Sequence, residues 1–294
     1  MGGDVSGDMS GRVCLVTGAT SGHGRAVAIA LAQRGAELVL LGRNQEKCAE
    51  VQREIASLCG GKEPEILLCD LSSRREIDET ARQFLASGRP LHVLVNNAGL
   101  VCLRRQETSE GVELTLAVNY LAMFQLTLRL LERLQQSARA RVVNICSDTY
   151  RIASLDLDDL QLRDSYSVSR AYSQSKLAIL YFTLELARRV AGSGVAVNAV
   201  DPGPVASNIG ANNPGLLYTL AAPMIRYLFP SAARAARTAL WVASAPELAT
   251  ESGGYYRSMK RRKRPLRKPD AALSRALIQE SARLTGVDFP SQNP

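Results

Sequence analysis

The chain has 294 residues, of which 36 are Lys or Arg and 28 are Asp or Glu, so its formal net charge is +8. Hydrophobic residues make up 46% of it, as in a soluble globular protein, and no apolar run reaches the roughly 18–20 residues of a membrane-spanning helix. The two histidines and six cysteines show no metal-ligand spacing, so we expect no metal site and reduced thiols in a cytoplasmic protein.

The first ten residues are polar and glycine-rich, unlike a signal or transit peptide, so residues 1–10 are predicted to be a disordered leader. Strand and helix patterns then alternate without an evident linker, which indicates a single domain over residues 11–294. Such alternation is typical of the α/β class. We predict a doubly wound (Rossmann) parallel sheet of about seven strands with helices on both faces.

The first strand pattern, residues 12–17, runs into a glycine-rich turn and then into a helical pattern over residues 25–34. The turn contains Gly18, Gly22 and Gly24, in the spacing Gly-x-x-x-Gly-x-Gly. Glycines allow backbone N–H groups to approach a diphosphate at the positive end of a helix. This stretch therefore predicts a dinucleotide site.

The second strand, residues 37–41, is followed by Gly42 and Arg43. Folds of this kind that prefer NAD(H) place an acid near this point to hold the ribose hydroxyls, whereas an arginine accommodates a 2′-phosphate. Because Gly42 carries no acid and Arg43 supplies a cation, we predict NADP(H) rather than NAD(H). The alternative is that Arg43 is an ordinary surface charge.

Two further strands bring polar residues to the same region. The third, residues 65–69, ends at Asp70, whose carboxylate can reach the exocyclic amine of an adenine. The fourth, residues 91–95, runs into Asn-Asn-Ala-Gly at residues 96–99. Ligands of open α/β sheets bind beyond the carboxyl ends of the strands, so both segments are expected at the site.

A long helix is predicted over residues 108–136, with Asn119 as a polar residue in its apolar stretch. A buried amide needs a hydrogen-bond partner, and the alternative is that Asn119 faces solvent. The fifth strand, residues 141–146, places Ser147 at its end. Residues 148–171 are rich in Asp and Ser, and we interpret them as a loop or short-helix insertion.

Tyr172 and Lys176 open a helical pattern that runs to about Val190. Residues four apart lie one turn apart on the same helix face. An ammonium there would lower the pKa of the phenol, whose ordinary value is about 10, and make it an acid or base near neutral pH. The alternative is an aromatic ring packed under an aliphatic stem. Tyr166 is a rival, but its partner four residues later is Arg170.

The sixth strand, residues 195–200, leads into Asp201-Pro202-Gly203. Residues 203–230 include an apolar, proline-bounded segment, which we interpret as a lid over an apolar substrate, with a packed helix as the alternative. A helix over residues 232–245 and a short strand over residues 253–256 follow.

Eight Lys and Arg and no acid lie within residues 257–268, RSMKRRKRPLRK, before a C-terminal helix predicted over residues 269–286. The other 28 basic residues, 36 less these eight, match the 28 acidic ones, so the excess charge belongs to this run. We expect a basic loop that contacts an acidic membrane surface peripherally, which a liposome-binding assay would test. A solvated loop without a partner is the alternative. Nucleic acid is not expected, because no recognition motif or interleaved aromatic accompanies the charge.

Four separated motifs together resemble the short-chain dehydrogenase/reductase family: the glycine turn, Asn-Asn-Ala-Gly, Ser147 ahead of Tyr172 and Lys176, and Pro202-Gly203. The insertion after Ser147 and the sequence around Tyr172 are similar to the retinol dehydrogenase-like branch. The resemblance implies an NADP(H)-dependent oxidoreductase that interconverts a lipophilic alcohol and its carbonyl compound, of retinoid, steroid or long-chain aldehyde type. It also implies that the helices of residues 108–136 and 172–190 could form a homodimer face.

The family's catalytic tetrad falls here on Asn119, Ser147, Tyr172 and Lys176. The resemblance implies that Tyr172 is the general acid or base, that Ser147 polarises the substrate oxygen, that Lys176 also holds the nicotinamide ribose, and that Asn119 holds a water. The alternative function is a non-catalytic NADP(H)-binding sensor that binds a partner protein.

The sequence departs from the family pattern at His23 in the glycine turn, His92 before Asn-Asn-Ala-Gly, and Asp201 before Pro-Gly. The cofactor contacts expected from the motifs and the resemblance are Gly18, Thr20, Ser21, Gly22, His23, Gly24, Arg43, Asp70, Leu71, Asn97, Ala98, Gly99, Tyr172, Lys176, Pro202, Gly203, Val205 and Ser207.

Overall fold

A computed structural model describes residues 7–203, 231–263 and 270–290 of the chain. Its strands form one sheet in the order β3-β2-β1-β4-β5-β6-β7-β8. Neighbouring strands are parallel except for the antiparallel pair β7 and β8. The strands are β1 (Val13–Thr17), β2 (Glu37–Gly42), β3 (Glu65–Leu68), β4 (Val93–Asn96), β5 (Ala140–Ile145), β6 (Val195–Asp201), β7 (Tyr255–Arg257) and β8 (Lys260–Arg261). The predicted α/β class and doubly wound parallel sheet are confirmed, with β8 as a strand beyond the expected seven.

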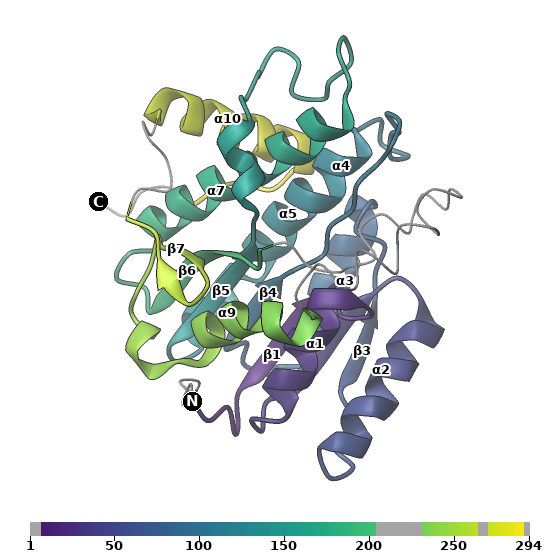
Figure 1. Cartoon of the computed structure of the whole chain (residues 1–294), viewed down its shortest axis with the longest axis vertical. Helices are drawn as coiled ribbons and strands as arrows, with labels where there is room; N and C mark the ends of the chain where they lie inside the picture. Colours follow the sequence, from purple (N-terminus) through teal and green to yellow (C-terminus); the bar gives the residue numbers. More distant parts are fainter. Residues whose placement is uncertain (1–6, 204–230, 264–269, 291–294) are drawn as a thin grey trace.

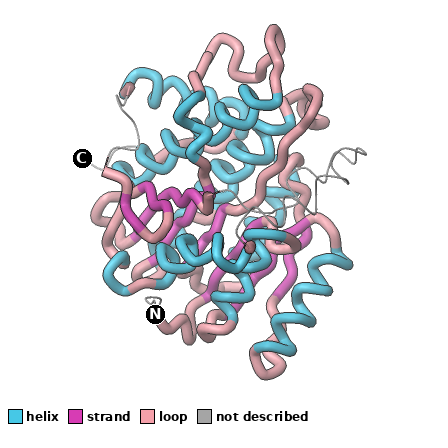
Figure 2. The backbone as a smooth tube through the Cα atoms, viewed as in Figure 1, coloured by secondary structure: helices cyan, strands magenta, loops and turns pink. Residues whose placement is uncertain are grey.

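Helices cover both faces of this sheet, as Figures 1 and 2 show. One hydrophobic core lies between the sheet and α1, α2 and α9, and the other between the sheet and α3, α5, α7 and α10. The α-helices are α1 (Gly22–Ala32), α2 (Gln45–Leu58), α3 (Arg74–Ala86), α4 (Leu114–Leu116), α5 (Ala122–Arg129), α6 (Leu131–Gln136), α7 (Val168–Arg189), α9 (Ala232–Ser244) and α10 (Ala271–Thr285). No helix within the described residues is both long and apolar enough to cross a bilayer.

The inner strands are mostly apolar because both of their faces are covered. In β1, Val13 and Leu15 belong to one core, whereas Cys14 and Val16 belong to the other. Successive side chains of a strand point to opposite faces, so a strand between two helix layers has no solvent side. Because strands β1 to β7 run parallel, their carboxyl ends lie at a common edge.

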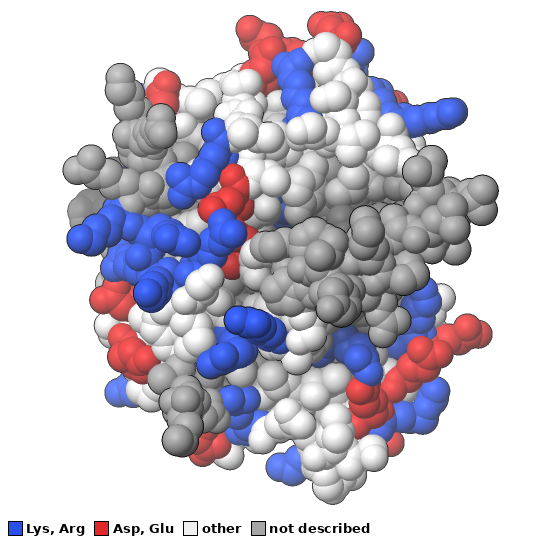
Figure 3. All heavy atoms as spheres, in the orientation of Figure 1, with Lys and Arg blue, Asp and Glu red and all other residues white. Residues whose placement is uncertain are grey.

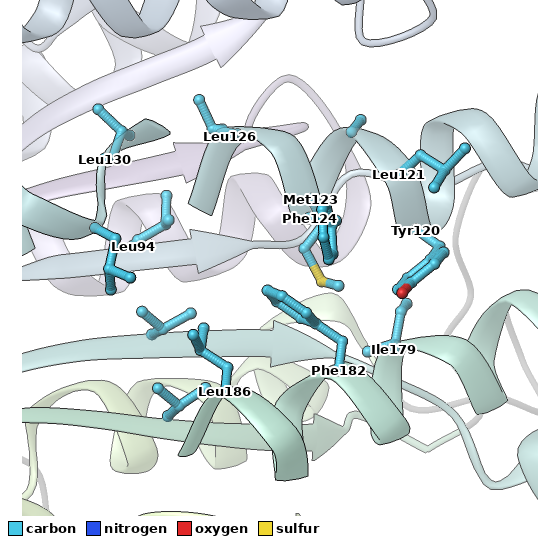
Figure 4. Packing of buried hydrophobic residues seen from close by; sticks show 14 of the residues in the cluster. Leu94, Tyr120, Leu121, Met123, Phe124, Leu126, Leu130, Ile179, Phe182 and Leu186 are labelled. Atoms are coloured by element: carbon cyan, nitrogen blue, oxygen red, sulfur yellow. The ribbon is translucent and has the colours of Figure 1, made fainter. Parts of the chain in front are cut away.

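Aromatic rings fill the core between α5 and α7 (Figure 4). The ring of Phe124 lies 5.2 Å from Phe182, and the ring of Tyr120 lies 6.2 Å from Phe124, measured between centroids. Phe289, which follows α10, stacks on Phe124 at 6.1 Å. The C-terminal segment is therefore anchored to the same core as the helix that carries Tyr172.

The predicted helix of residues 108–136 is wrong in its start and its continuity. The helical segment begins at Leu114, because Gly111 adopts a positive φ of 75° and the Glu113 carboxylate caps the first turn. Residues Ala117–Leu121 then form a π-helical turn that contains Asn119. Such turns are frequently found at functional sites.

The basic run begins as a hairpin rather than a loop. Ser258 and Met259 both have positive φ and connect β7 to β8. Figure 3 shows basic side chains gathered on the side of the molecule where this hairpin lies. Arg257 pairs with two aspartates, and Arg261 pairs with Glu251. Membrane contact stays a prediction that rests on the remaining basic side chains.

Several sequence predictions fall outside the described residues. They are residues 1–6 of the leader, nearly all of the predicted lid of residues 203–230, the cofactor contacts Val205 and Ser207, and residues 264–268 of the basic run.

Replacing Phe182 by alanine should lower the free energy of unfolding by about 3–5 kcal/mol, the usual cost of emptying a buried aromatic site. Phe182 is fully buried and contacts three other rings. Urea denaturation provides the measurement. Leu58→Ala is the control, since that side chain is 52% exposed and its loss should cost less than about 0.5 kcal/mol. Equal effects of the two substitutions would contradict the assignment of this core.

Candidate active site

The predicted site residues that the structure describes lie at the carboxyl edge of the sheet. The glycine turn joins β1 to α1, residues 97–99 follow β4, Ser147 follows β5, and Pro202 follows β6. Strand order reverses between β1 and β4, because β2 and β3 continue on one side of β1 and β4 to β6 on the other. Ligands of open α/β sheets bind in the crevice at this switch point.

The glycine turn is held by the side chain of Asn97. Its amide nitrogen donates to the carbonyl oxygens of Thr17 at 2.9 Å and Gly18 at 3.3 Å, and its oxygen lies 2.9 Å from Nδ1 of His23. Gly24 must be glycine, since a Cβ there would lie 2.2 Å from the Asn97 amide nitrogen. The side chains of Asn97 and His23 therefore brace the turn. This contact between Asn97 and His23 was not predicted from the sequence. The departure from the family pattern at His23 was the one feature that could have indicated it.

Burial lowers the pKa of His23, so its imidazole is neutral around pH 7. The neutral ring leaves the positive end of α1 without an additional side-chain cation at this position. It also allows one ring nitrogen to carry the proton of the hydrogen bond with Asn97.

The N-terminus of α1 has backbone N–H groups that no side-chain cap satisfies within the described part of the chain. Ser21 precedes the helix, but its side chain forms no capping hydrogen bond among the described residues. The N-cap side chains Asn44, Ser73 and Ser167, in contrast, each accept a hydrogen bond from the first turn of α2, α3 or α7. Free N–H groups at a helix N-terminus form an anion site, so this segment fits the diphosphate of a dinucleotide.

The end of β2 is packed too closely to take a side chain without a shift of its neighbours. A Cβ on Gly42 would lie 2.8 Å from Sγ of Cys48 and 3.0 Å from a methyl group of Thr20. Arg43 is exposed directly after it. Asp70, expected near the adenine, uses Oδ1 to accept hydrogen bonds from the backbone N–H and the hydroxyl of Ser72. These contacts fix the position of its carboxylate.

Asn119 is buried, so the solvent-facing alternative is wrong. Its oxygen accepts from the N–H of Leu100 at 2.7 Å, and its amide nitrogen donates to the Leu100 carbonyl at 3.0 Å and to Oγ of Ser175 at 3.1 Å. The side chain therefore joins the loop after β4 to α7. A Cβ on Gly99 would lie 3.4 Å from the Asn119 oxygen and 3.8 Å from Nζ of Lys176, which places these groups next to one another.

Ser147, Tyr172 and Lys176 meet where β5 faces α7. The Ser147 hydroxyl lies near the phenol of Tyr172, where hydrogen bonding between them acts to lower the pKa of that phenol. The Lys176 ammonium lies 5.4 Å from the centre of the Tyr172 ring and donates to the Ile145 carbonyl at 3.1 Å. Helix α7 begins at Val168, one turn before Tyr172, where the Ser167 side chain caps it. The rival Tyr166 donates its hydroxyl to the Cys102 carbonyl.

The expected lowering of the Tyr172 pKa is wrong for the unliganded chain. Burial, reinforced by Cys146 and Asp201, raises the pKa of Tyr172 to about 12, and the hydrogen bond from Ser147 opposes this only partly. Burial also lowers the pKa of Lys176. Tyr172 is therefore a protonated phenol at neutral pH.

Comparisons with known proteins agree with this geometry. A sequence model described as short chain dehydrogenase matches residues 12–214. Human retinol dehydrogenase 13 is 36% identical, with 96% of this chain and 86% of that protein covered. Mouse polyprenol dehydrogenase is 38% identical, with 94% of this chain and 84% of that protein covered.

Solved structures also share the fold. A protein from Mycobacterium paratuberculosis is 30% identical with a TM-score of 0.75, and 97% of each chain is covered. The Pseudomonas aeruginosa RhlG/NADP active-site complex is 26% identical with a TM-score of 0.67, covering 88% of this chain and 98% of that one.

Asn119→Ala should lower the free energy of unfolding by about 1–3 kcal/mol, because it leaves polar groups of Leu100 without their partner. Hydrogen exchange at the Leu100 amide should accelerate. In Asn119→Asp a carboxylate oxygen can still accept from the Leu100 amide. Exchange of that amide should therefore stay slower than in the alanine variant. Identical exchange in both variants would contradict the proposed contact between the Asn119 side chain and the loop after β4.

Proposed function

The chain belongs to the short-chain dehydrogenase family and is an oxidoreductase acting on CH–OH and C=O groups, and from this premise we propose that it uses NADP(H) to interconvert a lipophilic alcohol and its carbonyl compound. The observation that carries the proposal is the meeting of Ser147, Tyr172 and Lys176 beside a glycine turn with an uncapped helix. The retinol and polyprenol dehydrogenases among its relatives support a lipophilic substrate.

A protonated phenol suits the reduction of a carbonyl group. When bound, the nicotinamide supplies the hydride, and the protein supplies orientation and the proton. Ser147 holds and polarises the substrate oxygen, and Tyr172 transfers its phenolic proton to that oxygen. In the reverse direction the phenolate must accept the proton from the alcohol. Burial disfavours the phenolate, so oxidation should speed up as the pH rises toward the pKa of Tyr172.

Lys176 and Asn119 would support this proton transfer. The Lys176 ammonium is held between the Ile145 carbonyl and the Tyr172 ring, from where it can reach the nicotinamide ribose. Both N–H groups of Asn119 are used, but its oxygen has a second lone pair free to hold the expected water. Such a water would link Lys176 to the solvent.

The preference for NADP(H) rests on the end of β2. Close packing around Gly42 disfavours the acid that would hold unmodified ribose hydroxyls, and Arg43 lies exposed beside it, where it could pair with a 2′-phosphate. The relatedness to an NADP-bound structure supports the same cofactor.

Tyr172→Phe should lower turnover by about 100- to 10,000-fold, since it removes the proton donor, while NADPH affinity stays near that of the unchanged protein. NADPH oxidation with a panel of retinal, steroid ketones and long-chain aldehydes is the assay, and fluorescence titration gives the affinity. Tyr166→Phe, which removes a hydroxyl bonded to a backbone carbonyl, is the matched control and should keep most of the activity. Near-full turnover by Tyr172→Phe would refute the mechanism.

Arg43→Ala should weaken NADPH binding by about 10- to 100-fold, the cost of losing a charge-assisted contact, and leave NADH binding within about twofold. Parallel titrations with both dinucleotides measure the difference. Arg53→Ala, on the exposed face of α2, serves as a control for the loss of one positive charge. An equal loss for NADPH and NADH would overturn the role of Arg43.

A further inference from the structure

Charged side chains from three separate elements meet directly beside Ser147. Asp148 follows Ser147 in the 3-10 helix Asp148–Ile152, Asp201 ends β6, and Arg257 ends β7. One guanidinium nitrogen of Arg257 pairs with Oδ2 of Asp148 and lies 3.5 Å from Oδ2 of Asp201. The parallel pairing of β6 and β7 sets Asp201 opposite Arg257, so the sheet itself fixes this contact.

Both carboxylates also hold other groups at the site. Oδ2 of Asp201 accepts from the N–H of Asp148 at 3.2 Å, and its Oδ1 accepts from the N–H of Gly203 at 2.7 Å. Oδ1 of Asp148 accepts from the hydroxyl of Tyr255 at 2.8 Å. Asp201 therefore connects the residue after Ser147 with the Pro-Gly turn, where we expect the cofactor.

This arrangement is stable only with a cation. Asp201 is 2% exposed, and burial raises its pKa. A carboxylate removed from water needs an opposite charge and hydrogen-bond donors, or it takes up a proton. Among the described residues, Arg257 is the basic side chain that forms an ion pair with Asp201, and it also offsets the repulsion between Asp201 and Asp148.

We propose that Arg257 is a positioning residue that clamps the Ser147 segment to the Pro202-Gly203 turn through its paired contacts with Asp148 and Asp201. The idea rests on the proposed function, in which Ser147 must hold the substrate oxygen beside the phenol of Tyr172. Without the guanidinium, Asp201 is protonated or turns away, the N–H of Asp148 loses its acceptor, and the hydroxyl of Ser147 moves. Arg257 thus belongs to the internal structure of the site rather than to the basic surface.

The test compares Arg257→Gln with Arg261→Gln, a matched control in the same hairpin whose partner is the exposed Glu251. We expect Arg257→Gln to lower kcat for carbonyl reduction at least tenfold while KM and NADPH affinity stay within about threefold, and Arg261→Gln to change all three by less than twofold. Adding Asp201→Asn to Arg257→Gln removes the unpaired carboxylate and should recover at least part of kcat. A kcat of Arg257→Gln within twofold of the unchanged protein, or a further loss in the double variant, would overturn the proposal.

A second readout needs neither substrate nor cofactor. Amide hydrogen exchange of residues 147–152 in the unliganded protein, above all at Asp148, should be at least tenfold faster in Arg257→Gln and unchanged in Arg261→Gln. Unchanged exchange in Arg257→Gln would refute the clamp whether or not the protein turns over. Faster exchange in a protein that reduces no carbonyl compound would keep the clamp and refute the proposed function.

Discussion

The site depends on a chain of buried amide and hydroxyl groups that joins two strands to two helices. The side chain of Asn96 in β4 donates to Asn144 in β5 and to Thr127 in α5, each at 2.9 Å, and Asn144 donates to Thr183 in α7 at 3.0 Å. Buried polar groups without partners are costly, so a shifted helix or strand would lose these bonds. Asn144 lies one residue short of the end of β5, and Thr183 lies three turns beyond Tyr172. The network therefore fixes where Ser147 and Tyr172 can meet.

Much of this architecture could be predicted because it depends on local patterns. Alternating strand and helix patterns gave the parallel sheet, and glycine spacing marked the turn. Tyr172 and Lys176 are four residues apart, so once the segment is helical they lie on the same helix face. Polar residues that follow the strands could be assigned to the site from the sequence, because parallel strands place their carboxyl ends at a common edge.

Other features depend on contacts between distant residues and could not be read from the sequence. Arg257 looked like one of eight surface cations, whereas its partner Asp148 lies 109 residues earlier in the chain. The π-helical turn contains Asn119, whose side chain bonds the loop at Leu100, and neither feature is visible in a helical sequence pattern. The pKa of Tyr172 was misjudged because the spacing shows a neighbouring ammonium but not the burial of the phenol, which raises its pKa.

The two outermost strands of the sheet are both short. Strand β3 has four residues, and β8 has two, Lys260 and Arg261, which are exposed and charged. Short edges and lysine or arginine on them discourage pairing with the edge of another sheet. A second copy of this chain would therefore find little to extend at either side of the sheet. Continuous β-pairing between copies would therefore not obstruct the carboxyl edge of the sheet, where the site lies.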